Sequence, residues 1–206
     1  KMLGTSKENI VKWIAEMKEQ EQNPMLGNRG VRLGMENEKI IQVEAEAIAR
    51  AIAHVKSLGL SVNAEVMIPL VAEVKEFIIA KDIFVTEAKK HGLNEDGYIL
   101  GTMIELPRGA MIVRELVKAG AQFISIGTND LTQTTHGLGR DDTGDLIDAY
   151  QVTGVIEINP WRTMTKQTGR LVRFAVEEAR KANPDVVIKC GVCGEHGGDD
   201  ETIKKY

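Results

Sequence analysis

Four short apolar runs, each separated from the next by a longer stretch of helical character, constrain the fold of this chain more than any other feature. The runs occupy residues 64–71, 97–106, 121–130 and 185–195. They are almost continuously apolar, as strands covered on both faces are, and none of them alternates cleanly with polar residues. Strands that alternate with helices are typical of parallel βα folds. The sequence therefore predicts an α/β protein with four parallel strands.

The segments around these runs repeat apolar residues at helical spacing and end at recognised helix-stop residues. Two of the segments end at Gly92 and Gly120, the second of them begins with Pro107, and a third ends at Asn183-Pro184. The stretch 137–163, with scattered Gly, Asp and Pro, is the least regular. Helices are expected over residues 36–59, 72–92, 107–120 and 168–185.

The length of the chain limits how complete such an array can be. An eight-stranded (β/α)8 barrel takes about 250 residues, whereas this chain has 206, with four strands already spread over residues 64–195. We therefore expect residues 1–206 to form one domain, a partial (β/α)8 barrel of TIM type. Such a piece has two open sheet edges, so in isolation it should misfold, aggregate or pair with another copy.

Composition excludes several classes of protein. The formal net charge is −4, with Lys and Arg scattered along the chain, so a nucleic-acid partner is not expected. No apolar run is long enough to cross a bilayer, and residues 1–13 lack the apolar core of a signal peptide. Two cysteines in 206 residues fit a reducing compartment. We expect a cytoplasmic protein without a membrane partner, and leave an organelle open because a targeting segment could lie upstream.

Three of the four predicted strands end in polar residues at the same edge of the sheet. These are Glu105, then Asn129 and Asp130, and then Cys193 and Glu195. In parallel βα folds this edge carries the active site. Carboxylates of Glu105 and Asp130 on adjacent strands could converge on one hard cation of the Mg²⁺ type, with positions left for water and substrate oxygens. Alternatively, each acid caps the following helix or faces solvent.

Glycines surround two further sets of candidate ligand-binding groups. In the motif GTND, the backbone amides of Gly127 and Thr128 and the side chain of Asn129 are donors suited to an oxyanion. An ordinary glycine turn with an Asn cap would have the same sequence pattern. In NPMLGNRGVRLG, Arg29 and Arg32 could each form two hydrogen bonds to one phosphate or carboxylate. A surface arginine paired with a nearby acid is equally compatible with the spacing.

The thiol of Cys193 admits several roles. A disulfide with Cys190 is excluded if residues 186–193 form a strand, because the two side chains point to opposite faces and lie roughly 10 Å apart, beyond the reach of a disulfide. A structural zinc would need four soft ligands, and no second close pair exists among His54, His91, His136 and His196. An inert buried thiol, and a strand-end acid or nucleophile, remain open. We assign no catalytic role to any histidine.

Taken together, the motifs resemble the phosphoenolpyruvate- and pyruvate-binding barrel of the pyruvate phosphate dikinase family. The resemblance runs from about residue 23 to 206 and is weakest over 137–170, where INPWRTMTKQ departs from the usual sequence of the family. It rests on the stretches NPMLGNRGVRLG, VMIPLV, GTMIELPRGA, SIGTNDLTQTT, GRDD and GVCGEHGGD.

The resemblance implies a reaction and a role for each matching residue. ATP and phosphate would charge a histidine on a swivelling domain, and the phosphohistidine would then phosphorylate pyruvate enolate, giving AMP, diphosphate and phosphoenolpyruvate overall. Glu105 and Asp130 would bind Mg²⁺ and, with Gly127, Thr128 and Asn129, the substrate. Arg29 would hold the phosphoryl group, and Cys193 would exchange a proton with the methyl carbon.

The same resemblance implies parts that this sequence does not contain. The first barrel strands with their RTEH-type motif, the last strand, and the phosphohistidine and ATP-binding domains have no counterpart in these residues. The phosphohistidine domain of the same parent chain would therefore be a partner, and the intact parent is expected to be a homodimer. Two sister families, phosphoenolpyruvate synthase and enzyme I of the sugar phosphotransferase system, are alternatives, as is a non-catalytic half-barrel that only binds a partner. LTQTT and GEHGGD favour the dikinase.

Overall fold

The computed structural model describes residues 6–20 and 25–206 of the chain, and its centre is a parallel sheet of four strands. The strands lie in chain order, with each strand hydrogen-bonded to the next one. They are β1 (Glu65–Ile68), β2 (Ile99–Ile104), β3 (Phe123–Gly127) and β4 (Lys189–Cys193). The α/β class and the partial barrel predicted from the sequence are confirmed, and in the described chain β1 and β4 each have a neighbour on one side only.

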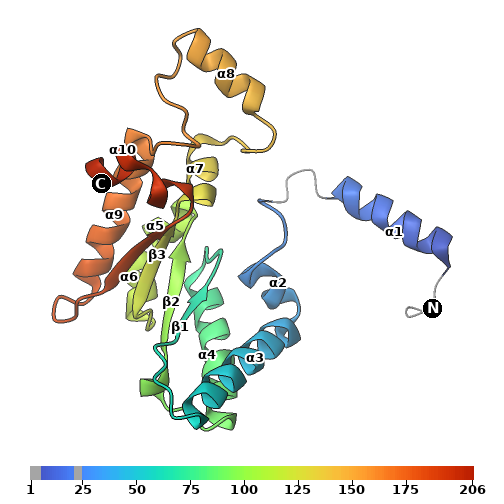
Figure 1. The fold of residues 1–206 in the computed structure, drawn as a ribbon, viewed down its shortest axis with the longest axis vertical. Coiled ribbons are helices and arrows are strands. Elements are labelled where there is room, and N and C mark those ends of the chain that lie inside the picture. Colours follow the sequence, from blue (N-terminus) through green and yellow to red (C-terminus); the bar gives the residue numbers. More distant parts are fainter. Residues whose placement is uncertain (1–5, 21–24) are drawn as a thin grey trace.

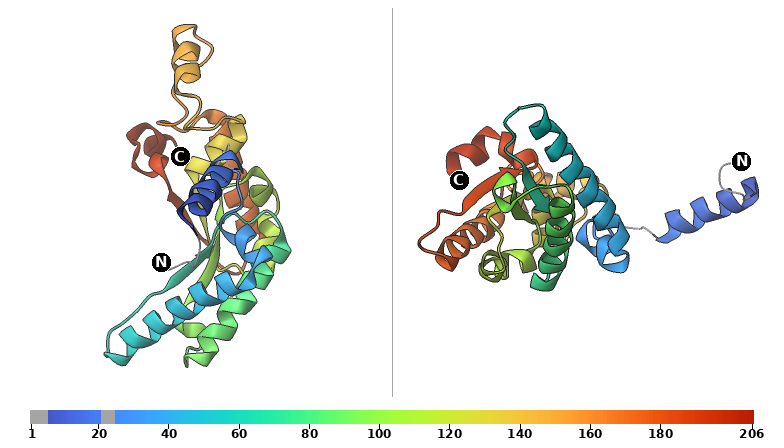
Figure 2. Two further views of the ribbon diagram at one scale, coloured as in Figure 1. Left: turned by 90° about the vertical axis from the view of Figure 1, so that its right-hand side faces the viewer. Right: turned by 90° about the horizontal axis from the view of Figure 1, so that it is seen from below.

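Helices pack along one face of the sheet and beyond the carboxyl ends of the strands (Figure 1). Figure 2 shows that α1 lies to one side, away from the sheet. None of the helices in the described residues is both long and apolar enough to cross a lipid bilayer. The helices are α1 (Lys7–Gln20), α2 (Val31–Glu36), α3 (Glu38–Ser57), α4 (Val74–Lys90), α5 (Pro107–Met111), α6 (Val113–Lys118), α7 (Thr128–His136), α8 (Gly144–Val152), α9 (Lys166–Ala182) and α10 (Asp200–Lys205).

Several boundaries differ from the sequence prediction for local reasons. The helix expected over 107–120 is divided at Ile112 into α5 and α6. The helix expected over 36–59 begins after Asn37, whose side chain accepts a hydrogen bond from the amide of Lys39, and α2 precedes it. Residues 137–163, the least regular stretch of the sequence, are mostly turns and loops but include α8, which stands out from the body of the protein (Figure 1).

The third predicted strand, 121–130, was too long by its last three residues. The strand ends at Gly127, and Thr128, Asn129 and Asp130 form the first turn of α7 instead. Polar residues such as these, and an acid above all, are favourable at a helix N-terminus because the first amides there have no partner within the helix. The polar group that the sequence placed on a strand end therefore sits at the start of a helix.

Alternate residues of each strand point to opposite faces of the sheet, and the helix-covered face holds the main core. Ile104, Ile124 and Ile126 are completely buried there, together with apolar side chains of α4, α6 and α9. A second cluster joins α3 and α4 to the start of β2, around Phe84 and Leu100. Helices α3, α4, α6 and α9 thus bury apolar side chains in these two clusters, which fixes the strand ends relative to one another.

The other face of the sheet is concave. Lys189 of β4 and Glu65 of β1 form an ion pair with 2.5 Å between Nζ and Oε1, although two strands lie between them. Neighbouring strands are about 4.8 Å apart, so a flat sheet would separate β1 from β4 by about 14 Å. The contact is possible because the sheet curls around this face, as a section of a barrel wall does.

Candidate active site at the carboxyl ends of the strands

Glu105 follows directly after β2 and is the most deeply buried acid of the site. The residue is only 4% exposed, and its Oε1 accepts a hydrogen bond of 2.6 Å from the amide of Leu70. Burial raises the pKa of the Glu105 carboxyl to about 7, opposed by the Leu70 amide and assisted by the negative charge of Asp130. A buried carboxyl beside a second one is a pair that a cation would stabilise.

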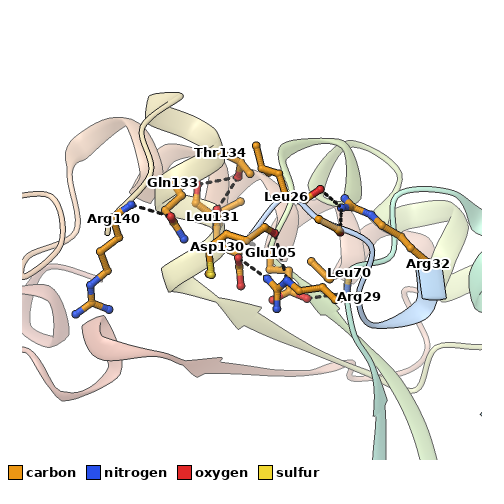
Figure 3. A network of polar contacts seen from close by, with 12 residues as sticks. Leu26, Arg29, Arg32, Leu70, Glu105, Asp130, Leu131, Gln133, Thr134 and Arg140 are labelled. Atoms are coloured by element: carbon orange, nitrogen blue, oxygen red, sulfur yellow. Dashed lines mark hydrogen bonds and ion pairs between the residues drawn. The ribbon is translucent and has the colours of Figure 1, made fainter. Parts of the chain in front are cut away.

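Asp130 brings the second carboxylate to Glu105 from the first turn of α7. The two carboxyls lie close enough for Asp130 to raise the pKa of Glu105. Asp130 Oδ1 also lies 2.6 Å from Nη2 of Arg29, whose Nε donates to the carbonyl of Met25. Figure 3 shows Arg29, Asp130 and Glu105 pointing toward one another from three different segments. The expectation that the acids of adjacent strands converge agrees with this geometry.

The two arginines of the glycine-rich segment 23–34 do different things. Arg29 reaches the acids, whereas Arg32 donates to the carbonyls of Leu26 and Gly27 and so braces its own loop (Figure 3). The sequence pattern could not separate the two, because both stand among glycines at similar spacing. The first two residues of this segment, Asn23 and Pro24, lie outside the described residues.

Gly127, at the end of β3, keeps the centre of the site open. A Cβ built on Gly127 would lie 2.7 Å from Met103 Sδ, 2.8 Å from Glu105 Cβ and 2.9 Å from Glu105 Oε2. Only glycine fits there without moving Glu105. In the register of the sheet, Gly127 is opposite Cys193 on β4, so it lies between the acid and the thiol. Glu105 and Cys193 are thus two strand spacings apart, about 10 Å between their backbones.

Cys193 is half-buried on the concave face. Its Sγ lies 3.4 Å from the Ser125 hydroxyl and 3.4 Å from the carbonyl oxygen of Ile126. Cys190 packs against the core on the opposite face, where burial raises the pKa of its thiol. Both cysteines are free, which confirms the prediction that they do not form a disulfide. Ser125 is a neighbour of the thiol that sequence reasoning missed.

Thr128 and Asn129 hold the turn that follows Cys193. The Thr128 hydroxyl donates to the carbonyl of Cys193 at 2.9 Å, and Asn129 Oδ1 accepts from the amide of Glu195 at 3.1 Å. Gly194 takes a φ of 91°, and a Cβ there would lie 2.5 Å from Thr128 Oγ1. The residues expected to donate to a ligand therefore also fix the position of the thiol.

The histidines do not join the acids. His196 is 1% exposed, its Nε2 lies 3.0 Å from the carbonyl oxygen of Pro160, and desolvation lowers its pKa. It therefore anchors the loop after Cys193. Glu195 is exposed, with Arg140 at 3.8 Å, and is not part of the acid pair. No group of three or more His, Cys, Asp or Glu side chains in the described residues is arranged to hold a metal.

The acid pair still has the character of a site for a hard cation. It offers two carboxylates, one of them buried, and a cation there would complete its oxygen ligands from a substrate and from water. A cavity of about 210 Å³ opens beside Asp130, lined by Met25, Leu26, Gln133, Thr134 and residues 137–139. Of the site residues, Asp130 is the one that lines this cavity; Glu105, Arg29 and Cys193 lie outside its lining.

Comparison with known proteins agrees with this arrangement. Residues 4–205 match the family described as "PEP-utilising enzyme, PEP-binding domain". Pyruvate, phosphate dikinase 1, chloroplastic, of Arabidopsis thaliana is 38% identical over 204 residues, which cover 97% of this chain. Pyruvate, phosphate dikinase of Clostridium symbiosum is 40% identical over 187 residues, 88% of this chain. The chain spans about a fifth of the length of these relatives, 21% in each case. The chain therefore belongs to the PEP-utilising enzymes and is homologous to the PEP-binding domain of pyruvate phosphate dikinase.

Proposed function

We propose that residues 1–206 are part of the phosphoenolpyruvate- and pyruvate-binding barrel of a pyruvate phosphate dikinase. The reaction would be the Mg²⁺-dependent transfer of a phosphoryl group from a phosphohistidine, carried by another domain of the same chain, to pyruvate enolate. The observation that supports this most is the cluster of Glu105, Asp130 and Arg29 facing Cys193 across Gly127.

The residues of the chain would act in sequence around this small substrate. Bound Mg²⁺, held by Glu105 and Asp130, would supply positive charge beside the developing enolate oxygen. The thiolate of Cys193 would take a proton from the methyl carbon, which leaves the electron pair in the enolate. The enolate oxygen would then attack phosphorus, so that a P–O bond forms and the P–N bond to histidine breaks. Arg29 and the amides at the start of α7 would hold the phosphoryl oxygens.

The proton transfer assigned to Cys193 can be measured apart from phosphoryl transfer. In the intact protein we expect Cys193→Ala to slow exchange of the pyruvate methyl protons with solvent at least about a hundredfold, the range for loss of a positioned acid–base group. Cys190→Ala, which removes the thiol on the opposite face, should leave exchange within about twofold of the original. Exchange that persisted in Cys193→Ala would remove the role assigned to this thiol.

Dependence on inorganic phosphate distinguishes the dikinase from its sister families. Formation of phosphoenolpyruvate from ATP and pyruvate by the intact protein should require phosphate and release diphosphate. Formation that proceeds equally well without phosphate would assign the chain to a phosphoenolpyruvate synthase. Phosphoryl transfer to a carrier protein, without any use of ATP, would assign it to the enzyme I type.

A further inference from the structure

We infer that Leu70 is a positioning residue for the acid pair, because its backbone and its side chain each hold one half of the site. This inference rests on the proposed function, since it concerns the same acids. Leu70 follows β1 and Pro69, and it is not itself part of a strand or helix. The sequence gives no reason to single it out, because it reads as one more apolar residue at the end of a buried run.

The backbone of Leu70 adopts a conformation that leucine normally avoids. Its φ is 57°, and it is the one residue other than glycine with a positive φ in the described parts of the chain. The left-handed region is unfavourable for a side chain with a Cβ, and residues held there occur often at functional sites. Leu70 is also 1% exposed, so its surroundings determine its conformation.

This conformation delivers the amide of Leu70 to Glu105. The distance from N to Oε1 is 2.6 Å, and the hydrogen bond is buried. Pro69 has no N–H, so the Leu70 amide is the first donor beyond the end of β1. The donor belongs to the backbone of the loop after β1, whereas Glu105 follows β2. It therefore fixes the carboxyl relative to both β1 and β2.

The side chain of Leu70 supports the segment that carries Arg29. Gly30 has a φ of 59°, and a Cβ built on it would lie 3.1 Å from Leu70 Cδ1 and 3.3 Å from Pro69 Cγ. The backbone of Gly30 thus rests directly on Leu70. Arg29 precedes Gly30 in the chain and reaches Asp130 at 2.6 Å. Leu70 therefore positions both the carboxyl of Glu105 and the backbone from which the Arg29 side chain extends.

A role limited to core packing makes a different prediction from a positioning role. Leu93, which is 5% exposed and belongs to the second apolar cluster, offers a matched control because Leu93→Ala removes the same atoms as Leu70→Ala. Replacing the Leu70 amide by an ester, with the leucine side chain retained, removes only the N–H. The readout is the affinity of the intact protein for Mn²⁺, with the binding that Glu105→Gln loses taken as the site.

We expect Leu70→Ala and the ester to weaken Mn²⁺ binding about tenfold or more, as loss of groups that orient metal ligands does. Leu93→Ala should leave the affinity within about twofold. An ester variant that binds Mn²⁺ as tightly as the original protein would overturn the inference, and so would an equal loss in Leu93→Ala.

A measurement without metal separates this inference from the proposed function. Hydrogen exchange at the Leu70 amide should be slow in the original protein and about tenfold faster or more in Glu105→Ala, because its acceptor is gone. If the original protein binds no Mn²⁺ but this exchange behaves as expected, the proposed function fails and the positioning of Glu105 by Leu70 stands. If exchange at Leu70 does not respond to Glu105→Ala, the positioning role fails.

Discussion

The two faces of the four-stranded sheet are built from alternate residues of the same strands, and they contribute differently. On the helix-covered face, isoleucines of β2 and β3 are completely buried among apolar side chains. The concave face carries Ser125, Gly127, Cys193, and the pair formed by Glu65 and Lys189. The comparison teaches that a single strand can commit one face to stability and the other to chemistry, so that adjacent residues differ in what they do.

The strongest test of this division uses two adjacent residues, Ile124 and Ser125. Ile124 is 0% exposed in the main core, so Ile124→Ala should lower the free energy of unfolding by about 2–5 kcal/mol through lost burial and the cavity left behind. Ser125→Ala should change it by about 0.5 kcal/mol or less. Hydrogen exchange of the β2 and β3 amides in the intact protein measures both.

The two variants should also differ in how methyl-proton exchange depends on pH. Because the Ser125 hydroxyl lies 3.4 Å from Cys193 Sγ, Ser125→Ala should alter the pH profile of methyl-proton exchange in pyruvate. In Ile124→Ala, the fraction of protein that stays folded should keep the original profile. A profile that shifts equally in both variants would mean that the two faces are not functionally distinct.

The next test concerns the acid pair at the end of the concave face. The pKa of Glu105 is raised to about 7, so below this pH the carboxyl holds a proton that a cation must displace. Affinity for Mn²⁺ should therefore fall about tenfold for each pH unit below 7 and should level off above it. The expected loss corresponds to about 1.4 kcal/mol per pH unit.

The control for this pH dependence is Glu105→Gln, in which the titrating group is gone. Its residual Mn²⁺ affinity should be weak and nearly independent of pH between 5 and 7. Titrations of both proteins at several pH values, with the difference between them taken as the site, measure the effect. An affinity in the original protein that does not change with pH in this range would contradict a raised pKa of Glu105.

Much of this division was predictable from the sequence, because it follows from periodicity. Continuous apolar runs predict parallel strands, their polar ends predict Glu105 and Asp130 as a pair, and the odd spacing separates Cys190 from Cys193. Contacts between segments distant in sequence were not predictable. The left-handed backbone of Leu70, the ion pair of Arg29 with Asp130, and the approach of Ser125 to the thiol depend on how the strands pack, which no local pattern records.

The boundary error nearest the site has a physical cause. The third strand was extended through Asp130 because its first polar residues were taken as a strand end, whereas unpaired amides at the start of α7 make those same residues a helix N-terminus. The expected proximity of the two acids did not depend on this boundary, because a strand end and the helix start that follows it occupy the same edge of the sheet. An error in the local structure thus left the convergence of Glu105 and Asp130 intact.

The smallest expected effect lies at the other end of the concave face, in the ion pair between Glu65 and Lys189. The side chains are 39% and 60% exposed, so water screens the pair, and such pairs contribute about 0.2–1 kcal/mol. Lys189→Met should lower the local stability of the sheet edges by no more than this, and the loss should shrink at high salt. Hydrogen exchange of the β1 and β4 amides at low and high salt would detect it.

Exchanging the charges in the double variant Glu65→Lys, Lys189→Glu should restore the coupling, since both residues face the same concave surface. If the exchanged pair shows no coupling at low salt, β1 and β4 do not approach each other across that surface, and the curl of the sheet that brings Cys193 around to the acids loses its support.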